Sequence, residues 1–301
     1  MEGILPLWKP RGMTSHDCVY KVRKLLKIKK VGHTGTLDPD VDGVLPICIG
    51  RATKIAEYLT DSPKAYEGEV TIGTATATED ASGEIVEEKA IIGMISSKDV
   101  QEVLHKFHGQ ITQVPPMYSA VKVNGKRLYE YARKGIEVER PQRVVNIYEI
   151  KLLNSFEFLN KENNRFRFFV KASKGTYVRT LAVDIGKELG YPAHMSDLTR
   201  VASGSFNGED CLTLDDVAEK VEKGNLELFP LERALSHLTK LIINEKLEMQ
   251  VKNGQVLPIP DGYESENKLA LFNKNNDCVA IYIPHPTKKG LMKPEKVLRN
   301  E

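Results

Sequence analysis

The 301-residue sequence lacks several features that mark familiar classes of protein. No apolar run approaches the ~20 residues that a membrane helix needs, and the apolar run near the N-terminus is too short for a signal peptide. The cysteines stand far apart, with no CxxC pair, which argues against a zinc ribbon or a disulfide framework. There are four of them: Cys18, Cys48, Cys211 and Cys278. We therefore expect a protein of the reducing cytoplasm.

The common cofactor and nucleophile motifs are also missing. The sequence contains no GxxxxGK followed by Ser or Thr, no strand-linked GxGxxG, no HExxH and no GxSxG. These absences argue against nucleotide-driven chemistry, hydride transfer on a Rossmann domain and zinc catalysis. What remains is carboxylate chemistry that uses no cofactor and no metal.

Charge is nearly balanced, with 43 Lys and Arg against 41 Asp and Glu. Any contact with nucleic acid must therefore depend on local patches. One candidate is residues 19–30, which hold six basic residues and no acid. A solvated helix face and a surface facing phosphates both fit this segment. Another is residues 122–134, where basic residues alternate with Tyr129 and Tyr131; an RNA-facing loop and an amphipathic surface helix fit it equally well.

Periodicity predicts a mixture of helices and strands. Helical spacing occurs at residues 19–30, 52–59, 100–107 and 177–190, whereas strands are expected at 44–49, 66–72 and 165–172. A polar linker is expected at about 236–246. The pattern of the segment after it predicts short strands and turns, with a hairpin around residues 273–277. This pattern favours an α+β protein with a small C-terminal all-β domain.

Three aspartates at every second position draw attention to residues 32–43, GHTGTLDPDVDG. Their spacing matches the start of an EF-hand loop, which needs a bidentate glutamate at its twelfth position. Counting from Asp38, that position is Ile49, inside an apolar run that predicts a strand. The calcium-site interpretation therefore fails, and Asp40 and Asp42 fit an exposed, hydrated turn.

Asp38 differs from the other two aspartates. Leu37 precedes it and Pro39 follows it, so the backbone is restricted on its C-terminal side. The preceding Gly-His-Thr-Gly allows close approach of the backbone to a ligand and places His33 in the same loop. A restrained carboxylate near an imidazole is a catalytic candidate.

A second candidate group lies in the segment SKGTYVRT. Thr176 is a natural N-cap, which would place Arg179 in the first turn of the following helix. A cation there opposes the helix dipole, so we expect Arg179 to have an anionic partner, a carboxylate or a phosphate, unless it is a simple surface arginine. Tyr177 has helical spacing with Leu181 and Ile185 and could equally belong to the core.

Six blocks of the sequence together resemble the tRNA pseudouridine synthase B (TruB) family. They are LWKPRGMTSHD, KVGHTGTLDP with GVLPICIGRATK, KAYEGEVTIGTATATED, QVPPMYSAVKVNGKRLYEYARKG, SKGTYVRT and AHMSDLTR, in the order of the family and spanning about residues 5–200. The segment after about 240 resembles an RNA-binding PUA domain more weakly.

The resemblance implies a fold and a division into domains. The fold class is α+β: a pseudouridine synthase fold with a mixed, largely antiparallel central sheet and flanking helices, plus a small C-terminal all-β PUA-like domain. The expected catalytic domain covers residues 1–235 and carries an RNA-gripping insertion at about 122–147. The PUA-like RNA-binding domain would cover residues 240–301.

The implied activity is isomerisation of uridine to pseudouridine in the T-loop of tRNA, at position 55. The N1–C1′ bond breaks, the base turns, and C5 joins the sugar carbon, without cofactor or metal. The implied partner is the T-arm stem-loop of tRNA, and the implied state is a cytoplasmic monomer. Two alternatives are a non-catalytic tRNA-folding chaperone and a hydrolase that releases free base.

The resemblance also implies roles for individual residues. Asp38 is the catalytic carboxylate, which either attacks C1′ or removes the C2′ proton, and Arg179 pairs with it. Asp40 and Asp42 depart from the small or apolar residues usual in the family. They would weaken the approach of RNA unless they face away or pair with nearby lysines.

The other implied site residues surround the substrate. Tyr66 stacks on the target base, Tyr177 lines the same pocket, and Leu198 forms an apolar wall. Lys9 supports the floor of the active site. His33 fills the space that the uridine leaves when it is extruded.

Overall fold

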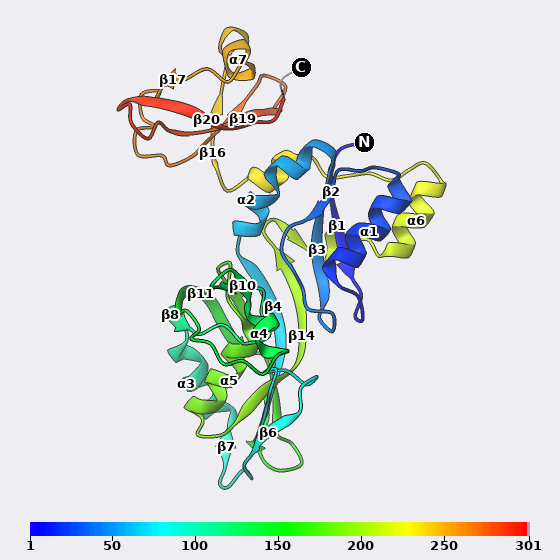
Figure 1. The fold of residues 1–301 in the computed structure, drawn as a ribbon, viewed down its shortest axis with the longest axis vertical. Coiled ribbons are helices and arrows are strands. Elements are labelled where there is room, and N and C mark those ends of the chain that lie inside the picture. Colours follow the sequence, from blue (N-terminus) through cyan, green and yellow to red (C-terminus); the bar gives the residue numbers. More distant parts are fainter. Residues whose placement is uncertain (300–301) are drawn as a thin grey trace.

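A central mixed sheet dominates the computed structural model, which describes residues 1–299 (Figure 1). Every neighbouring pair in it is antiparallel except β3 with β14, so the predicted mixed, largely antiparallel sheet is confirmed. Two short strands, β2 (Val31–His33) and β15 (Phe206–Asn207), extend β3 and β14. In spatial order the main path is β1 (Gly3–Lys9), β3 (Asp42–Ile49), β14 (Ala193–Ser203), β4 (Lys64–Ile72), β13 (Arg165–Ala172), β11 (Arg143–Leu152) and β8 (Gly109–Gln113).

Helices cover both ends of this sheet. Near β1 and β2, α1 (Ser15–Leu26) packs against α6 (Leu214–Glu222), whereas α3 (Ser97–Lys106) and α5 (Val178–Glu188) pack on β11 and β14. The predicted helix at 52–59 is divided, because a 3-10 helix, η1 (Gly50–Ile55), leads into α2 (Ala56–Asp61). None of the helices within residues 1–299 is long and apolar enough to span a membrane.

The predicted helix at 19–30 is displaced toward the N-terminus. A capping box at Thr14 and Asp17 starts α1 at Ser15. The helix ends at Leu26 because Lys27 adopts a left-handed conformation with φ of 55°. The last residues of the basic segment, 28–30, therefore lie in a loop.

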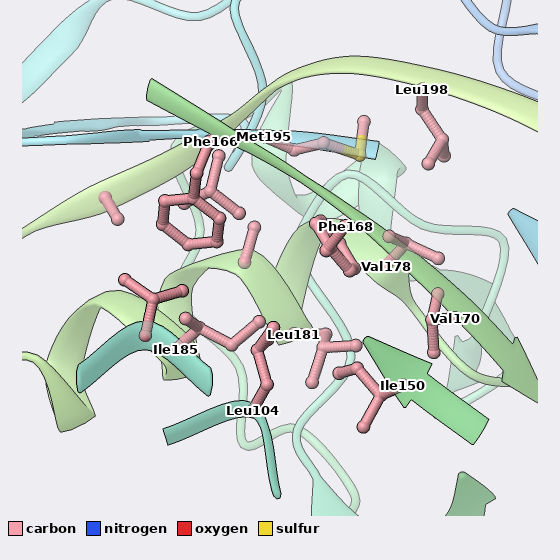
Figure 2. Packing of buried hydrophobic residues seen from close by; sticks show 14 of the residues in the cluster. Leu104, Ile150, Phe166, Phe168, Val170, Val178, Leu181, Ile185, Met195 and Leu198 are labelled. Atoms are coloured by element: carbon pink, nitrogen blue, oxygen red, sulfur yellow. The ribbon is translucent and has the colours of Figure 1, made fainter. Parts of the chain in front are cut away.

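The largest apolar cluster lies between the sheet and α5. Leu181 and Ile185 of α5 lie beside Phe166 and Phe168 of β13 (Figure 2). These residues are at most 1% exposed, and burial of such side chains contributes about 1.5–3 kcal/mol each. The cluster fixes the first turn of α5 against the sheet, and that turn carries Arg179.

A second sheet forms the C-terminal part of the chain, where Figure 1 shows it extending from the rest of the molecule. The predicted hairpin around residues 273–277 is confirmed, since the two strands beside it pair antiparallel. The predicted linker at 236–246 is wrong, because it holds a strand and the start of the helix α7 (Glu245–Lys252). The strand order is β16 (Thr239–Ile242), β18 (Leu269–Phe272), β19 (Cys278–Pro284), β20 (Leu291–Val297) and β17 (Leu257–Pro258).

The two sheets share an apolar junction. Leu59 and Leu235 pack in one cluster with Phe272 and Ile281 of the C-terminal sheet. The hydroxyl of Tyr58 donates a hydrogen bond to Glu295 across the same boundary. Because apolar side chains from both sides are buried there, removal of the C-terminal sheet would expose the other half of the cluster to water.

Gly43 marks a very close contact between β3 and β14. Its φ is +114°, and a Cβ at this position would lie 2.2 Å from the carbonyl oxygen of Arg200. We expect Gly43→Ala to lower the free energy of unfolding by about 2–4 kcal/mol, because the backbone of a neighbouring strand must move. Urea unfolding measures this difference. Gly32→Ala is the control, since no atom lies within 4 Å of its added Cβ; equal losses in both variants would contradict the explanation.

Candidate active site

The loop between β2 and β3 holds Asp38 in a restricted conformation. The backbone N–H of Leu37 donates to the hydroxyl of Ser15 at 2.9 Å. On the other side of Asp38, the carbonyl of Pro39 accepts from the ammonium of Lys9 at 3.0 Å and from the N–H of Gly12 at 2.9 Å. Contacts on both sides therefore fix the direction in which the Asp38 carboxylate projects.

Helix α5 brings Arg179 to the same place, although the predicted cap is wrong. Tyr177, not Thr176, occupies the N-cap position, because the Thr176 hydroxyl donates to the carbonyl of Ser173 instead. The side chain of Gln113, only 2% exposed, accepts from the N–H of Tyr177 and donates to its carbonyl. Arg179 is then the second helical residue, in the first turn as expected.

Arg179 joins two carboxylates. Its Nη2 lies 3.0 Å from Oδ2 of Asp38, and its Nη1 lies 3.3 Å from Oδ2 of Asp80. It also donates to the carbonyls of Thr78 and Tyr118, at 3.2 and 3.1 Å. Since only 8% of its side chain is exposed, the guanidinium is held by four acceptors, and these contacts orient both carboxylates.

Asp80 is a site residue that the sequence analysis missed. It lies in a polar turn, in which Glu79 adopts a left-handed conformation with a φ of 65°. The Thr78 hydroxyl donates to Asp80 Oδ1 at 2.7 Å, and the N–H of Ser82 donates to the same oxygen. The Asp-x-Ser spacing signals this turn, but only the tertiary fold places Asp80 against Arg179.

Burial and Arg179 act in opposite directions on Asp38. Burial raises the pKa of the Asp38 carboxyl above its ordinary value, and Arg179 lowers it, while the nearby Asp80 raises it again. Although 47% of the side chain is reached by solvent, the surrounding protein still reduces hydration of the carboxylate. The pKa therefore remains raised, and Arg179 limits the increase.

Five of the predicted site residues line one open pocket of about 630 Å³. This volume is typical of a small-molecule site. The pocket combines a carboxylate, a guanidinium, two aromatic rings and an apolar wall. The five residues are Asp38, Tyr66, Tyr177, Arg179 and Leu198.

The other two predicted residues lie outside the pocket lining. Lys9 is fully buried beneath the loop, where burial lowers its pKa, and it reaches Pro39 rather than the cavity. His33 stacks edge-on against His16, with ring centroids 5.0 Å apart. Lys9 is therefore placed to support the loop, and His33 lies half-buried beside it.

Two further cations below Tyr66 were not predicted. Arg200 faces Tyr66 across the β4–β14 pair, interacts electrostatically with it and donates to the carbonyl of Val44 at 2.7 Å. Lys64 donates to carbonyls at the end of α2, and burial lowers its pKa to about 7. Both line the pocket, so a guanidinium and an amine whose positive charge is disfavoured by burial border the cavity.

The aspartates after Asp38 have separate environments. Asp42 is not an exposed turn residue as expected: it begins β3, and its carboxylate accepts from Thr199 at 2.7 Å and from Arg11 at 3.3 Å. Asp40 is exposed. Within residues 1–299 no group of three or more His, Cys, Asp or Glu is placed to hold a metal ion.

One residue of the basic segment at 122–134 lines the pocket. Tyr129, in the short helix α4 (Leu128–Ala132), lines the cavity together with Tyr118 and Arg143. The segment also contains the small hairpin β9 (Lys122–Val123) and β10 (Lys126–Arg127). From Arg143 onward the chain belongs to β11 of the central sheet.

Comparisons with known proteins identify the family to which the sequence is similar. The family model described as TruB family pseudouridylate synthase (N terminal domain) matches residues 23–178, and that of the tRNA pseudouridylate synthase B C-terminal domain matches residues 179–241. The chain is 58% identical to tRNA pseudouridine synthase B of Bacillus licheniformis, covering 99% of this chain and 97% of that protein. It is 56% identical to the protein of the same name from Bacillus subtilis, covering 99% and 98%.

A solved structure extends the similarity to the fold. The structure entitled "Crystal Structure of a Cbf5-Nop10-Gar1 Complex" contains a chain with a TM-score of 0.76 and 28% identity. The match covers 99% of this chain and 85% of that one. The predicted pseudouridine synthase fold, with a C-terminal sheet unit, is confirmed.

Proposed function

We infer that the chain, which belongs to the TruB family of pseudouridylate synthases and is a pseudouridine synthase, isomerises uridine to pseudouridine in tRNA, at T-loop position 55. The observation that supports this most directly is the Asp38–Arg179 pair at 3.0 Å in a pocket lined by Tyr66 and Tyr177. A loop nucleotide can be extruded into such a pocket at a cost of a few kcal/mol. Bases of single-stranded RNA loops commonly stack on aromatic side chains in this way.

The proposed reaction needs an ionised carboxylate next to the ribose. Asp38 either attacks C1′ or removes the C2′ proton, and the N1–C1′ bond breaks. The uracil turns, C5 bonds to C1′, and the C5 proton is lost while N1 gains one. Substrate and product are isomers, so no oxidant, reductant or cofactor is required.

The remaining pocket residues have supporting roles in this proposal. Tyr66, which faces Arg200 across the β4–β14 pair, stacks on the base and assists removal of the C5 proton. Tyr177 and Leu198 close the sides of the pocket, while Lys9 supports the loop through Pro39. His33 occupies the position that the extruded uridine leaves in the RNA.

Binding of the RNA outside the pocket involves further parts of the chain. We assign the insertion at about 122–147 to gripping the RNA, because Tyr129 lies on the pocket rim and basic residues surround it. The C-terminal segment, residues 240–301, is assigned to RNA binding from its resemblance to a PUA domain. A monomer in the cytoplasm, where tRNA is found, completes the proposal.

One assay tests the reaction. The purified chain is incubated with an unmodified tRNA transcript labelled with tritium at uridine C5, and label release and nucleosides are followed. Release of one label per tRNA together with pseudouridine at position 55 is expected. Binding without product would indicate a chaperone instead, and free uracil would indicate a hydrolase; either result overturns the proposed function.

A further inference from the structure

We propose that the exposed face of helix α1 and the loop after it bind the sugar–phosphate backbone of the stem adjoining the target nucleotide. This inference rests on the proposed function, because it assigns a docking surface to the RNA substrate of the same site. We call this surface the α1 face. Its members are His16, Tyr20, Arg23, Lys24, Lys27, Lys29 and Lys30.

Helical spacing collects these side chains on one side. Positions 16, 20, 23, 24 and 27 recur every three or four residues, and so share one stripe of a helix with 3.6 residues per turn. All are exposed, and Tyr20 is 63% exposed. The opposite stripe, which includes Cys18 and Val22, is buried in the core.

The positive charge of the α1 face is not neutralised by the protein. None of its lysines forms an ion pair within residues 1–299, and neither does its one arginine, Arg23. The Arg23 guanidinium donates a hydrogen bond only to the carbonyl of Val31. Two nearby acids have partners elsewhere: Asp17 accepts from Thr14, and Asp216 of α6 accepts from Thr213. Five cations gathered without partners repel one another, and a polyanion relieves that repulsion.

The α1 face begins beside the loop that carries Asp38. Ser15, at the start of α1, accepts a hydrogen bond from Leu37, the residue before Asp38, and the ring of His16 contacts His33. From there the helix runs for twelve residues, about 18 Å at 1.5 Å per residue. An RNA strand that leaves the pocket along α1 therefore passes the cations in succession.

The chemistry of the α1 face fits a duplex backbone. Lysine is a point charge suited to phosphate, and a duplex presents one phosphate per strand for about every 3.4 Å of axis. About five phosphates of one strand thus lie within the length of α1. Surfaces for single strands depend on several stacking aromatic residues, whereas the middle of this face offers one tyrosine.

Substitution of three lysines tests the proposal. The variant Lys24→Gln/Lys27→Asn/Lys29→Gln keeps polar side chains, and Asn tolerates the left-handed conformation at position 27. Anisotropy measures its affinity for a fluorescent T-arm stem-loop RNA at several KCl concentrations. We expect the Kd to rise at least ~10-fold at about 0.1 M KCl, and the slope of log K against log salt to shrink by about 2, because up to three phosphate contacts are lost. In turnover assays KM rises, and kcat stays within about twofold.

A matched variant controls for bulk charge. Lys98→Gln/Lys161→Gln/Lys187→Gln removes the same charge from α3, from the turn between β12 (Phe158–Leu159) and β13, and from the last turn of α5, at the other end of the sheet (Figure 1). Its Kd is expected within about twofold of the unsubstituted chain. Unchanged affinity and salt slope in the α1 variant, or an equal loss in the control, overturns the proposal.

Failure of this proposal is separable from failure of the proposed function. The binding comparison needs no turnover, so it can be made even if the chain forms no pseudouridine. If the α1 variant binds RNA more weakly and the control variant does not, the result supports RNA binding by the α1 face, whatever the product assay shows. Conversely, normal pseudouridine formation with unaltered binding by the variant preserves the proposed function and overturns only the docking surface.

Discussion

Replacing Asp38 by Asn is expected to abolish pseudouridine formation, with kcat reduced at least ~10⁴-fold, equivalent to about 5.5 kcal/mol of transition-state stabilisation. An amide of nearly the same shape neither attacks C1′ nor accepts the C2′ proton, so both versions of the chemistry fail. Single-turnover assays with C5-labelled tRNA measure this loss without interference from product release.

Binding of RNA should survive the same substitution. Most of the affinity for tRNA is expected from phosphate contacts outside the pocket, and Arg179 keeps Asp80 as its partner. The Kd is therefore expected within about threefold of the original. Asp40→Asn is the matched control, since it removes the same charge two residues after Asp38, at a side chain that is exposed to solvent. Near-normal turnover in Asp38→Asn, or equal loss in Asp40→Asn, would show that the catalytic assignment is wrong.

The contrast between these two aspartates shows what local sequence can predict. The proline after Asp38 and the glycines before it indicated a restricted loop, and the structure shows how Lys9 and Ser15 hold that loop. Strand and helix periodicity located β4, β13 and α3 because each buries one continuous apolar face. Local pattern also placed Arg179 in a first helical turn.

Local sequence patterns could not predict contacts between residues that are far apart in the sequence. Asp80 belongs to a polar turn whose composition is typical of a solvated surface, and only its contact with Arg179, 99 residues away, gives it a role. Arg200 is fully buried below Tyr66, whereas arginine residues usually lie at the protein surface, and sequence alone predicts that location. The prediction of Thr176 as the N-cap was wrong for a similar reason, because the side chain of Gln113, from a distant strand, accepts the hydrogen bond of the Tyr177 N–H at the start of α5 instead.

Arg179→Gln is expected to reduce kcat by about 10²–10³-fold, a loss typical of a preorganised charge contact in an active site. The substitution removes the cation that links Asp38 and Asp80 and leaves two carboxylates facing each other. Stability should fall by about 2–3 kcal/mol, less than for a fully buried pair because Asp38 is partly solvated. Thermal unfolding measures that cost separately from the kinetics.

The pH profile distinguishes an electrostatic role of Arg179 from a structural one. Arg179 lowers the pKa of Asp38, and Asp80 raises it, so loss of the arginine must raise the pKa of Asp38 further. If the ionised carboxylate is the active form, the acid limb of kcat/KM moves to higher pH, and the variant recovers part of its activity as pH increases. Adding Asp80→Asn removes the like charge and should return the acid limb toward lower pH. An acid limb that stays in place in Arg179→Gln, with the same fractional loss of activity at every pH, would show that Arg179 acts through geometry alone.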